Sequence, residues 1–213
     1  MPVTAIAPVM RFAPLAGIVS LLLIGVVWRS WLQRRRYGTW GVVHFGLGEP
    51  TQAALAGGLI LAFVLLAGQA FEAALHPATV HLQMRSSPQG VLILSTLGVM
   101  ALVGGLALLV VAQLQMGSSW RIGIDESATT ALIDTGLFRF CRNPIYLALL
   151  VVITGYVALL PTSMSLIVWA AAYLGIRLQI GAEETYLQRT YGEAYHVYAH
   201  RVGRLLPAIG RRR

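Results

Sequence analysis

Long stretches without a charged side chain constrain the fold of this chain more than any other feature. One uncharged run extends from Ser86 to Ser119 and another from Asn143 to Ile176, and the segment between Arg11 and Arg29 is also uncharged and mostly apolar. A helix that crosses the hydrocarbon core of a bilayer needs about 20 predominantly apolar residues. These runs therefore predict an all-α protein that is integral to a membrane.

The composition agrees with a membrane protein. Of the 213 residues, 57% are hydrophobic and 11% are charged, and all 16 basic residues are arginine, which gives a net charge of +8 against 8 acidic residues. The arginines flank apolar stretches, where they orient helices and meet anionic headgroups, and no basic face interleaved with aromatics indicates nucleic-acid binding. The single cysteine, Cys141, excludes an internal disulfide, and we interpret it as a small apolar residue.

We expect about five transmembrane helices in a single integral membrane domain of residues 1–213. The N-terminal part, residues 1–116, is predicted to hold three of them, at Phe12 to Trp31, Thr51 to Phe71 and Gly90 to Ala112. The rest of the chain, residues 117–213, is predicted to hold the functional half. No internal repeat or low-complexity segment divides the sequence further.

The apolar run after Asn143 predicts the last two spans. It is too long for one crossing, and proline disfavours helix in the residue before it, so Pro161 favours a tight turn at residues 160–163. We therefore expect a short helical hairpin here. A cytoplasmic helical segment is expected to follow it at the C-terminus.

The distribution of arginines predicts the orientation of the chain. With five spans, most basic positions fall on one face, namely Arg34 to Arg36, Arg121, Arg139, Arg142 and the arginine-rich C-terminus. Only Arg11 and Arg85 fall on the other face. Because cytoplasmic loops carry an excess of basic residues, we expect the C-terminus in the cytoplasm and the N-terminus outside the plasma (inner) membrane.

The C-terminal tail is rich in tyrosine. Leu187, Tyr191, Tyr195 and Tyr198 follow one another at helical spacings, and Gly192 is expected to end or bend that helix. One interpretation is an interfacial helix whose tyrosines lie at headgroup level. The other is a lid that folds back, so that its rings cover an adenine or a lipid tail.

Two adjacent carboxylates end the last apolar span. Glu183 and Glu184 lie where the helix dipole disfavours negative charge, and a ligand with an ammonium group or hydroxyls would relieve that cost. The hairpin is expected to bring Arg142 close to Glu183. Arginine suits carboxylate or phosphate, whereas glutamate accepts hydrogen bonds from hydroxyl or ammonium groups, so the pair fits a zwitterionic ligand.

The histidines do not predict a metal site. His44, His76, His81, His196 and His200 show no ligand spacing with carboxylates. We interpret His196 and His200, four residues apart, as tail surface. No phosphate-binding loop or serine nucleophile motif is present in the sequence.

An ordered set of short motifs resembles a known family. The set comprises Leu132-Ile133-Asp134-Thr135-Gly136-Leu137-Phe138, Arg142-Asn143-Pro144-Ile145-Tyr146, Glu183-Glu184-Thr185-Tyr186-Leu187, Tyr191-Gly192-Glu193-Ala194-Tyr195, Tyr198, Arg201-Val202 and Pro207. It is similar to the C-terminal half of the isoprenylcysteine carboxyl methyltransferases, and the related phospholipid methyltransferases share the pattern. The resemblance covers about residues 117–207, whereas the preceding spans are similar only in being hydrophobic.

The resemblance implies a cofactor and a set of site residues. The cofactor is S-adenosylmethionine, held at the cytoplasmic ends of the last helices and covered by the C-terminal segment. Its implied contacts are Thr130, Ala131, Leu132, Ile133, Phe138, Asn143, Pro144, Ile145, Tyr146, Glu183 and Tyr195. The implied catalytic residues are Arg142, Gln179, Glu184 and Arg201, with no metal.

Four positions depart from the family pattern, one of them mildly, since Ala148 stands in for a common glycine. Phe138 stands where tyrosine is frequent, and Asn143 replaces the histidine of an Arg-His-Pro-x-Tyr motif. Gln179 stands where the eukaryotic enzymes carry an arginine that faces the substrate carboxylate. The resemblance therefore favours the methyl donor more strongly than a prenylcysteine acceptor.

Methyl transfer to a lipophilic acceptor or lipid is the function that these features favour, with carboxylate O-methylation as the first interpretation. A carboxylate acceptor needs no base, whereas for an alcohol, amine or thiol a base is expected among Glu184, His200 and Tyr195. One alternative is a membrane reductase that uses NADPH, because sterol reductases resemble the family in their final helices. Another is a helical scaffold or small transporter without enzymatic activity.

Overall fold

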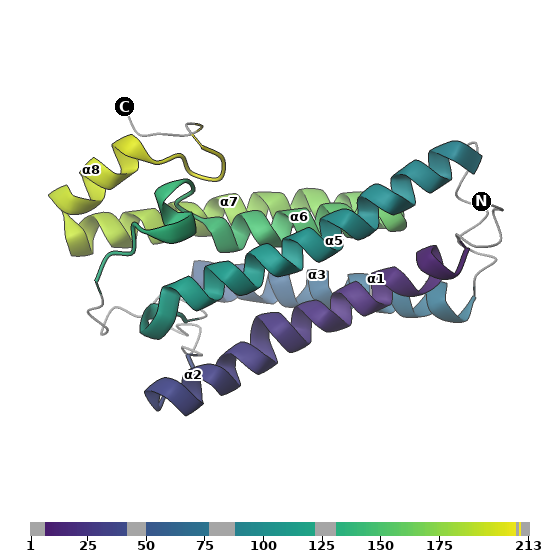
Figure 1. Cartoon of the computed structure of the whole chain (residues 1–213), viewed down its shortest axis with the longest axis horizontal. Helices are drawn as coiled ribbons and strands as arrows, with labels where there is room; N and C mark the ends of the chain where they lie inside the picture. Colours follow the sequence, from purple (N-terminus) through teal and green to yellow (C-terminus); the bar gives the residue numbers. More distant parts are fainter. Residues whose placement is uncertain (1–6, 42–49, 77–87, 122–130, 208, 210–213) are drawn as a thin grey trace.

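The chain folds into a bundle of long helices in the computed structural model, which describes residues 7–41, 50–76, 88–121, 131–207 and 209 (Figure 1). The helical elements are α1 (Ala7–Leu22), the π-helix η2 (Leu23–Trp28), α2 (Arg29–Tyr37), α3 (Pro50–Leu75), α5 (Pro88–Met116), the 3-10 turns η3 (Gly117–Ser119) and η4 (Gly136–Arg139), α6 (Pro144–Leu159), α7 (Ser163–Tyr191) and α8 (Glu193–Arg201). The all-α fold predicted from the sequence is confirmed.

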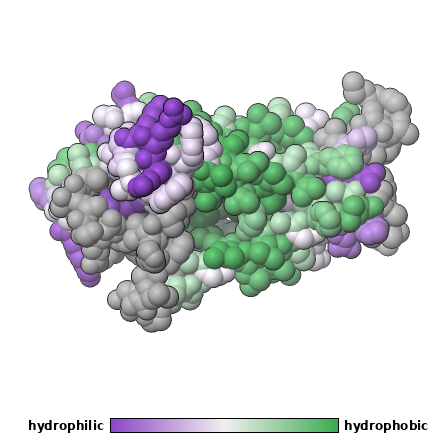
Figure 2. Space-filling view, turned by 90° about the horizontal axis from the view of Figure 1, so that it is seen from below, coloured by the Kyte–Doolittle hydropathy of each residue, from purple (hydrophilic) through white to green (hydrophobic). Residues whose placement is uncertain are grey.

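Four of the described helical stretches are long and apolar enough to cross a membrane. They are Arg11–Tyr37, Ala53–Leu75, Gln89–Ser119 and Ser163–Tyr191, and α6 is a shorter apolar helix of 16 residues. Figure 2 shows apolar residues over the middle of one face and hydrophilic residues at the two ends. This is the pattern of a polytopic membrane protein, as the sequence predicted.

Glycines allow α5 and α6 to pack closely. A Cβ atom at Gly105 of α5 would lie 2.7 Å from Cγ2 of Val152, and a Cβ atom at Gly155 of α6 would lie 2.7 Å from the carbonyl oxygen of Gly98. Small residues at a helix interface let the two backbones approach, which is the usual basis of tight helix packing in membranes. The close packing against α5 therefore fixes the position of α6, the first long described helix of the C-terminal half.

The predicted hairpin turn lies between α6 and α7. Helix α6 ends at Leu159, and Thr162 caps α7 because its Oγ1 accepts a hydrogen bond of 3.0 Å from the Ser165 amide. Ser165 Oγ in turn accepts a bond of 3.1 Å from the Thr162 amide, which completes a capping box. Pro161 lies between these ends, so the tight turn at residues 160–163 is confirmed.

Gly192 separates α7 from α8. Its φ of 53° lies in the left-handed region that favours glycine, and α7 ends at the residue before it. Helix α8 then returns alongside the end of α7 (Figure 1). Tyr195 and Tyr198 are buried in a cluster with Ala199 and Val202, so these two rings face protein. The predicted bend is confirmed, and the segment is folded back.

A buried arginine joins the N-terminal helices to the end of α5. Arg29, 1% exposed, donates to Oε1 of Gln33 at 2.7 Å and to the carbonyl oxygens of Gln113 at 3.3 Å and Gly117 at 2.8 Å. Its guanidinium carbon lies 4.6 Å from the centre of the Trp120 ring. These contacts satisfy carbonyls at a helix end, where intrahelical partners are lacking.

Candidate functional site

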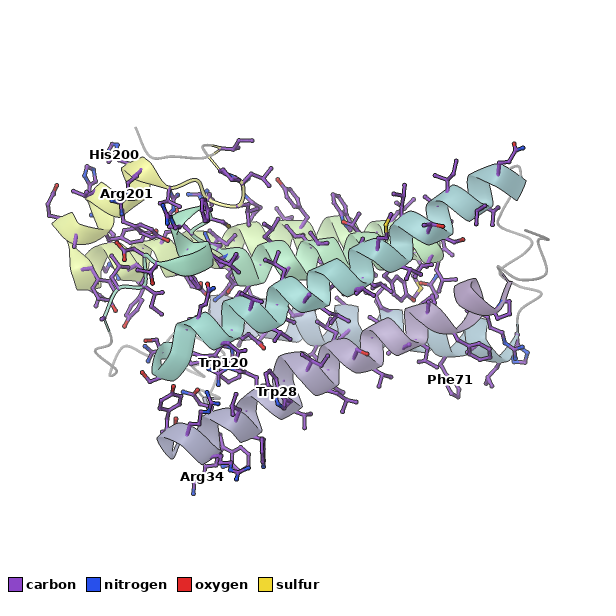
Figure 3. The ribbon with its side chains drawn as sticks, viewed as in Figure 1. Trp28, Arg34, Phe71, Trp120, His200 and Arg201 are labelled. Carbon is purple, nitrogen blue, oxygen red and sulfur yellow. The ribbon has the colours of Figure 1, made fainter. Side chains whose placement is uncertain are left out.

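The predicted site residues gather where η4, the start of α6, the end of α7 and α8 meet. Figure 3 shows Arg201 and His200 at this end of the bundle, together with Arg34 and Trp120, whereas Phe71 lies at the other end. The Arg142–Tyr146 motif follows η4 and leads directly into α6, whose first residue is Pro144, a favourable residue type for the start of a helix. The turn at Gly192 then places α8 over the same region.

Arg142 is buried at the centre of this region. Its Nε and Nη2 donate to Oε1 of Glu184 at 3.2 and 2.8 Å. Its Nη1 donates to the carbonyl oxygens of Ala199 at 2.8 Å and Val202 at 2.5 Å, at the end of α8. One guanidinium thus binds α7 and the last turn of α8 simultaneously.

A second arginine completes this ion pair. Arg204 Nε donates to Glu184 Oε1 at 3.1 Å, and its Nη2 lies 2.5 Å from Oε2. Glu184 is 1% exposed, so both of its oxygens are occupied by arginines away from water. Sequence reasoning missed this role of Arg204, because a single arginine among several in a basic tail carries no distinguishing signal.

The ion-pair partner of Arg142 is the second of the two adjacent carboxylates. The sequence led us to expect Arg142 near Glu183, and its ion pair is with the neighbouring Glu184. Adjacent residues on an α-helix point about 100° apart, so the two carboxylates face different surroundings. The adjacent carboxylates therefore have separate environments, one inside an ion network and one outside it.

Glu183 accepts hydrogen bonds from polar side chains of two helices. The Tyr146 hydroxyl of α6 and the Gln179 amide of α7, the latter at 3.2 Å, both donate to its Oε1. Among the described residues, none donates to Oε2. Glu183 is thus oriented by two neutral donors while one oxygen stays available as an acceptor. This set fits a ligand that presents an ammonium group or hydroxyls.

Residues 203–204 are bound to the chain just before α6. Cys141 and Gly203 form a parallel β-bridge, and the Arg142 amide donates to the Gly203 carbonyl at 2.9 Å. Asn143 Nδ2 donates to the Arg204 carbonyl at 3.0 Å. Asn143, which stands where the family has a histidine, therefore binds the tail through its side chain. Burial raises the pKa of the Cys141 thiol, so this cysteine stays neutral.

The η4 turn is held from both sides. Its Leu137 amide donates to Gln115 Oε1 of α5 at 2.7 Å, and the Tyr198 hydroxyl of α8 donates to the Phe138 carbonyl at 2.7 Å. Burial raises the pKa of Tyr198, which keeps the phenol protonated as a donor. Leu132 packs against the cluster that contains Tyr195. Helix α8 is thus connected to the segment expected to line the cofactor.

The remaining predicted residues lie as follows. Phe138, Asn143, Pro144 and Tyr195 are buried, Ile133, Ile145 and Tyr146 are half-buried, and Ala131 is exposed. Arg201 is exposed, with its Nη2 3.4 Å from Asp134 Oδ2. Thr130 lies outside the described residues. Within those residues, no group of three potential ligands could hold a metal ion.

Comparisons with known proteins agree with the resemblance found in the sequence. Residues 93–194 match the family model described as phospholipid methyltransferase. No curated protein sequence matches the chain. Among solved structures, the eukaryotic intramembrane Ras methyltransferase ICMT (isoprenylcysteine carboxyl methyltransferase) is similar in fold, with a TM-score of 0.51 at 15% identity over 100% of this chain and 99% of that one. The family model thus matches a segment that carries several of these motifs, and the fold of the whole chain is similar to that of a solved intramembrane methyltransferase.

Proposed function

We propose that this protein transfers a methyl group from S-adenosylmethionine to a lipophilic acceptor at the membrane. The observation that carries the proposal is the Glu183 carboxylate, which is oriented through Oε1 by Tyr146 and Gln179 and keeps Oε2 as an acceptor. The cofactor presents an ammonium group and ribose hydroxyls, both of which donate to carboxylates. The donor set around Glu183 therefore fits this cofactor.

The folded-back tail provides the cover for the cofactor in this proposal. Tyr195 and Tyr198 pack the tail against the protein, and Tyr198 fixes the backbone of Phe138. The Arg142 and Arg204 network holds the end of α8 in place. These residues would exclude water around the cofactor, together with the implied contacts Ala131, Leu132, Ile133, Asn143, Pro144 and Ile145 and, outside the described residues, Thr130.

The cofactor supplies an activated methyl group, so the protein mainly has to position the acceptor and keep water out. Glu184 does not act as a base in this proposal, because both of its oxygens bind arginines. Gln179 is directed to Glu183 rather than supplying a cationic partner for an acceptor carboxylate. Carboxylate O-methylation remains the first reaction to test. Arg201 is an exposed cation of α8 that could attract such an acceptor.

Binding of the cofactor tests the Glu183 site directly. We expect isothermal titration calorimetry of the purified chain in detergent to give saturable binding of S-adenosylmethionine. Glu183→Gln should weaken this binding at least tenfold, since it removes a charge-assisted hydrogen bond. Glu193→Gln, at an 85% exposed side chain on α8, is the matched control and should leave binding unchanged. Equal binding by all three proteins would contradict the proposal.

The acceptor requires a separate experiment. Membrane lipids and hydrophobic metabolites are incubated with the protein and with a methyl-labelled cofactor, and mass spectrometry then identifies the labelled product. A labelled methyl ester would support carboxylate O-methylation. A labelled headgroup amine would instead assign N-methylation of a lipid to the same site.

We also propose that the end carrying α8 faces the cytoplasm. Arg34, Arg35, Arg36 and the described arginines Arg189, Arg201 and Arg204 lie at this end, in agreement with the excess of basic residues in cytoplasmic loops. An alkaline phosphatase fused after Arg213 should be inactive. The same fusion, active outside the cytoplasm, would reverse the orientation without affecting the cofactor site.

A further inference from the structure

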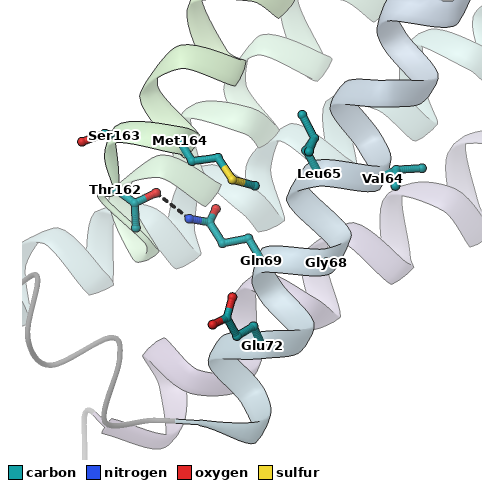
Figure 4. Close-up of a pocket in the computed structure, with 8 residues that line it drawn as sticks. All are labelled: Val64, Leu65, Gly68, Gln69, Glu72, Thr162, Ser163 and Met164. Carbon is teal, nitrogen blue, oxygen red and sulfur yellow. Dashed lines mark hydrogen bonds between the residues drawn. The ribbon is translucent and has the colours of Figure 1, made fainter.

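A cleft of about 480 Å³ lies between α3 and the start of α7, at the end of the bundle away from α8 (Figure 4). Its apolar side is formed by Val64, Leu65 and Met164, whose side chains are exposed. On a membrane-spanning helix, exposed apolar side chains of this kind face lipid tails. The cleft therefore opens toward the bilayer.

The other side of the cleft is polar. Gln69 reaches from α3 to the Thr162 hydroxyl, and Glu72 lies one turn further along α3 (Figure 4). Gln69 Oε1 also accepts from the Tyr156 hydroxyl at 3.1 Å, so this side is fixed by a hydrogen-bond network. An amphipathic molecule would find both an apolar and a polar surface here.

Opposite charges line this polar side. The Glu72 carboxylate is exposed, and no cationic side chain of the described residues pairs with it. Across the cleft, α7 begins at Ser163 and Met164, whose amides have no intrahelical acceptor and no other acceptor among the described residues. A helix N-terminus carries partial positive charge, so a negative group and a positive group face the same space.

We propose that this cleft binds a zwitterionic phospholipid with a primary ammonium headgroup, of the phosphatidylethanolamine type. The ammonium donates to Glu72, the phosphate lies at the start of α7, and the acyl chains follow Val64, Leu65 and Met164. A phosphatidylglycerol headgroup lacks the cation, and its phosphate is repelled by Glu72. A choline headgroup keeps the charge but has no N–H group to donate.

This lipid site is separate from the proposed methyl transfer. It uses α3 and the α6–α7 turn, whereas the Glu183 group lies near the other end of α7. A failure of cofactor binding would leave the lipid proposal standing. A failure of the lipid proposal would likewise leave methyl transfer untouched.

Gly68 provides a way to fill the cleft without disturbing the protein. It lies on the cleft, and a Cβ atom built there has no neighbour within 4 Å. Gly58 is on the same helix, also has no neighbour within 4 Å, and does not line the cleft. Gly58→Leu is therefore a matched control for Gly68→Leu.

Native mass spectrometry of the purified chain in detergent tests the proposal with phosphatidylethanolamine, phosphatidylcholine and phosphatidylglycerol of identical acyl chains. We expect phosphatidylethanolamine to bind about tenfold more tightly than phosphatidylglycerol, and Glu72→Gln to abolish that preference. Gly68→Leu should lower phosphatidylethanolamine binding at least fivefold while Gly58→Leu leaves it unchanged. Glu193→Gln, at the other end of the molecule, should keep the preference.

Two results would overturn the proposal. One is equal retention of the three lipids by the unaltered chain. The other is a preference for phosphatidylethanolamine that has the same size in Glu72→Gln and in Gly68→Leu as in the unaltered chain. Circular dichroism of each variant confirms that the helices are formed, so that lost binding cannot come from unfolding.

Discussion

Two buried arginines stabilise the two halves of this protein with different partners. Arg29, in the first half, binds an amide oxygen, backbone carbonyls and the face of Trp120, all of them neutral. Arg142, in the second half, binds two backbone carbonyls and the Glu184 carboxylate, which also binds Arg204. Both guanidinium groups satisfy carbonyls at a helix end, but among the described residues only Arg142 has a countercharge.

The difference indicates how strongly each arginine centre, Arg29 with its neutral partners and Arg142 with Glu184 and Arg204, fixes the position of the helix that it binds. Neutral partners hold α2 against the end of α5, and a small displacement would leave only unsatisfied dipoles. At the second centre, displacement of α8 would leave a buried carboxylate without its arginines, which costs far more. The charges therefore specify the position of the C-terminal segment, which is the part that covers the proposed cofactor site.

Removing the charged centre should produce the largest loss of stability. Arg142→Ala leaves the buried Glu184 with one arginine and frees the end of α8, so we expect the free energy of unfolding to fall by about 3–5 kcal/mol. Thermal unfolding in detergent measures this loss. Arg189→Ala, at an exposed arginine of α7, should change the melting temperature little.

Removing the neutral centre should cost less. Arg29→Ala deletes hydrogen bonds to Gln33 and to the end of α5 but leaves no unpaired charge, so we expect a loss of about 2–3 kcal/mol. The same thermal assay ranks the two variants. If Arg29→Ala proved as damaging as Arg142→Ala, the countercharge would not be what separates the two centres.

The close contact between α5 and α6 connects the two centres, because α5 ends at the first and α6 begins beside the second. Gly105→Ala adds a methyl group only 2.7 Å from Val152, so we expect a loss of about 1–3 kcal/mol. Gly104→Ala, one residue away, has no neighbour within 4 Å and should be neutral or stabilise the helix by up to about 1 kcal/mol. Equal melting temperatures for the two variants would argue against this close packing.

The smallest effect is expected at the bond between α8 and η4. Tyr198→Phe removes the donor to the Phe138 carbonyl, and we expect a loss of about 1 kcal/mol. Hydrogen exchange detects this locally as faster exchange of the amides in residues 136–140, with α5 unaffected. Unchanged exchange in η4 would mean that α8 does not hold this turn.

The fold was predictable where a residue type dictates one local outcome. Pro161 lacks an amide proton, and the helices end around it, while Gly192 adopts a positive φ at the predicted bend. Uncharged runs of sufficient length likewise predicted the membrane helices. The break of Leu23–Trp28 into π-helix was not predicted, because apolar periodicity does not distinguish it from α-helix.

The candidate site was predictable by region but not by partner. The motifs assigned Tyr146 and Glu183 to the cofactor and Gln179 to the acceptor, whereas in the structure Gln179 donates to Glu183. Which of the two carboxylates pairs with Arg142 depended on the rotation of α7 about its axis. The centre at Arg29 was missed for another reason. Its partners are amides and backbone carbonyls, which have no signature in an amino-acid sequence.

The pairing of Arg142 with residues far downstream has a consequence for biosynthesis. Arg142 precedes the α6–α7 hairpin, but the carbonyls and the second arginine that complete its network belong to residues 199–204. During translation the hairpin therefore emerges from the ribosome before this network can form. A chain truncated before Arg204 would contain all the membrane helices that the structure describes but would lack the contact between Arg204 and Glu184. The Arg142 network can therefore form only after residues 199–204 have been translated.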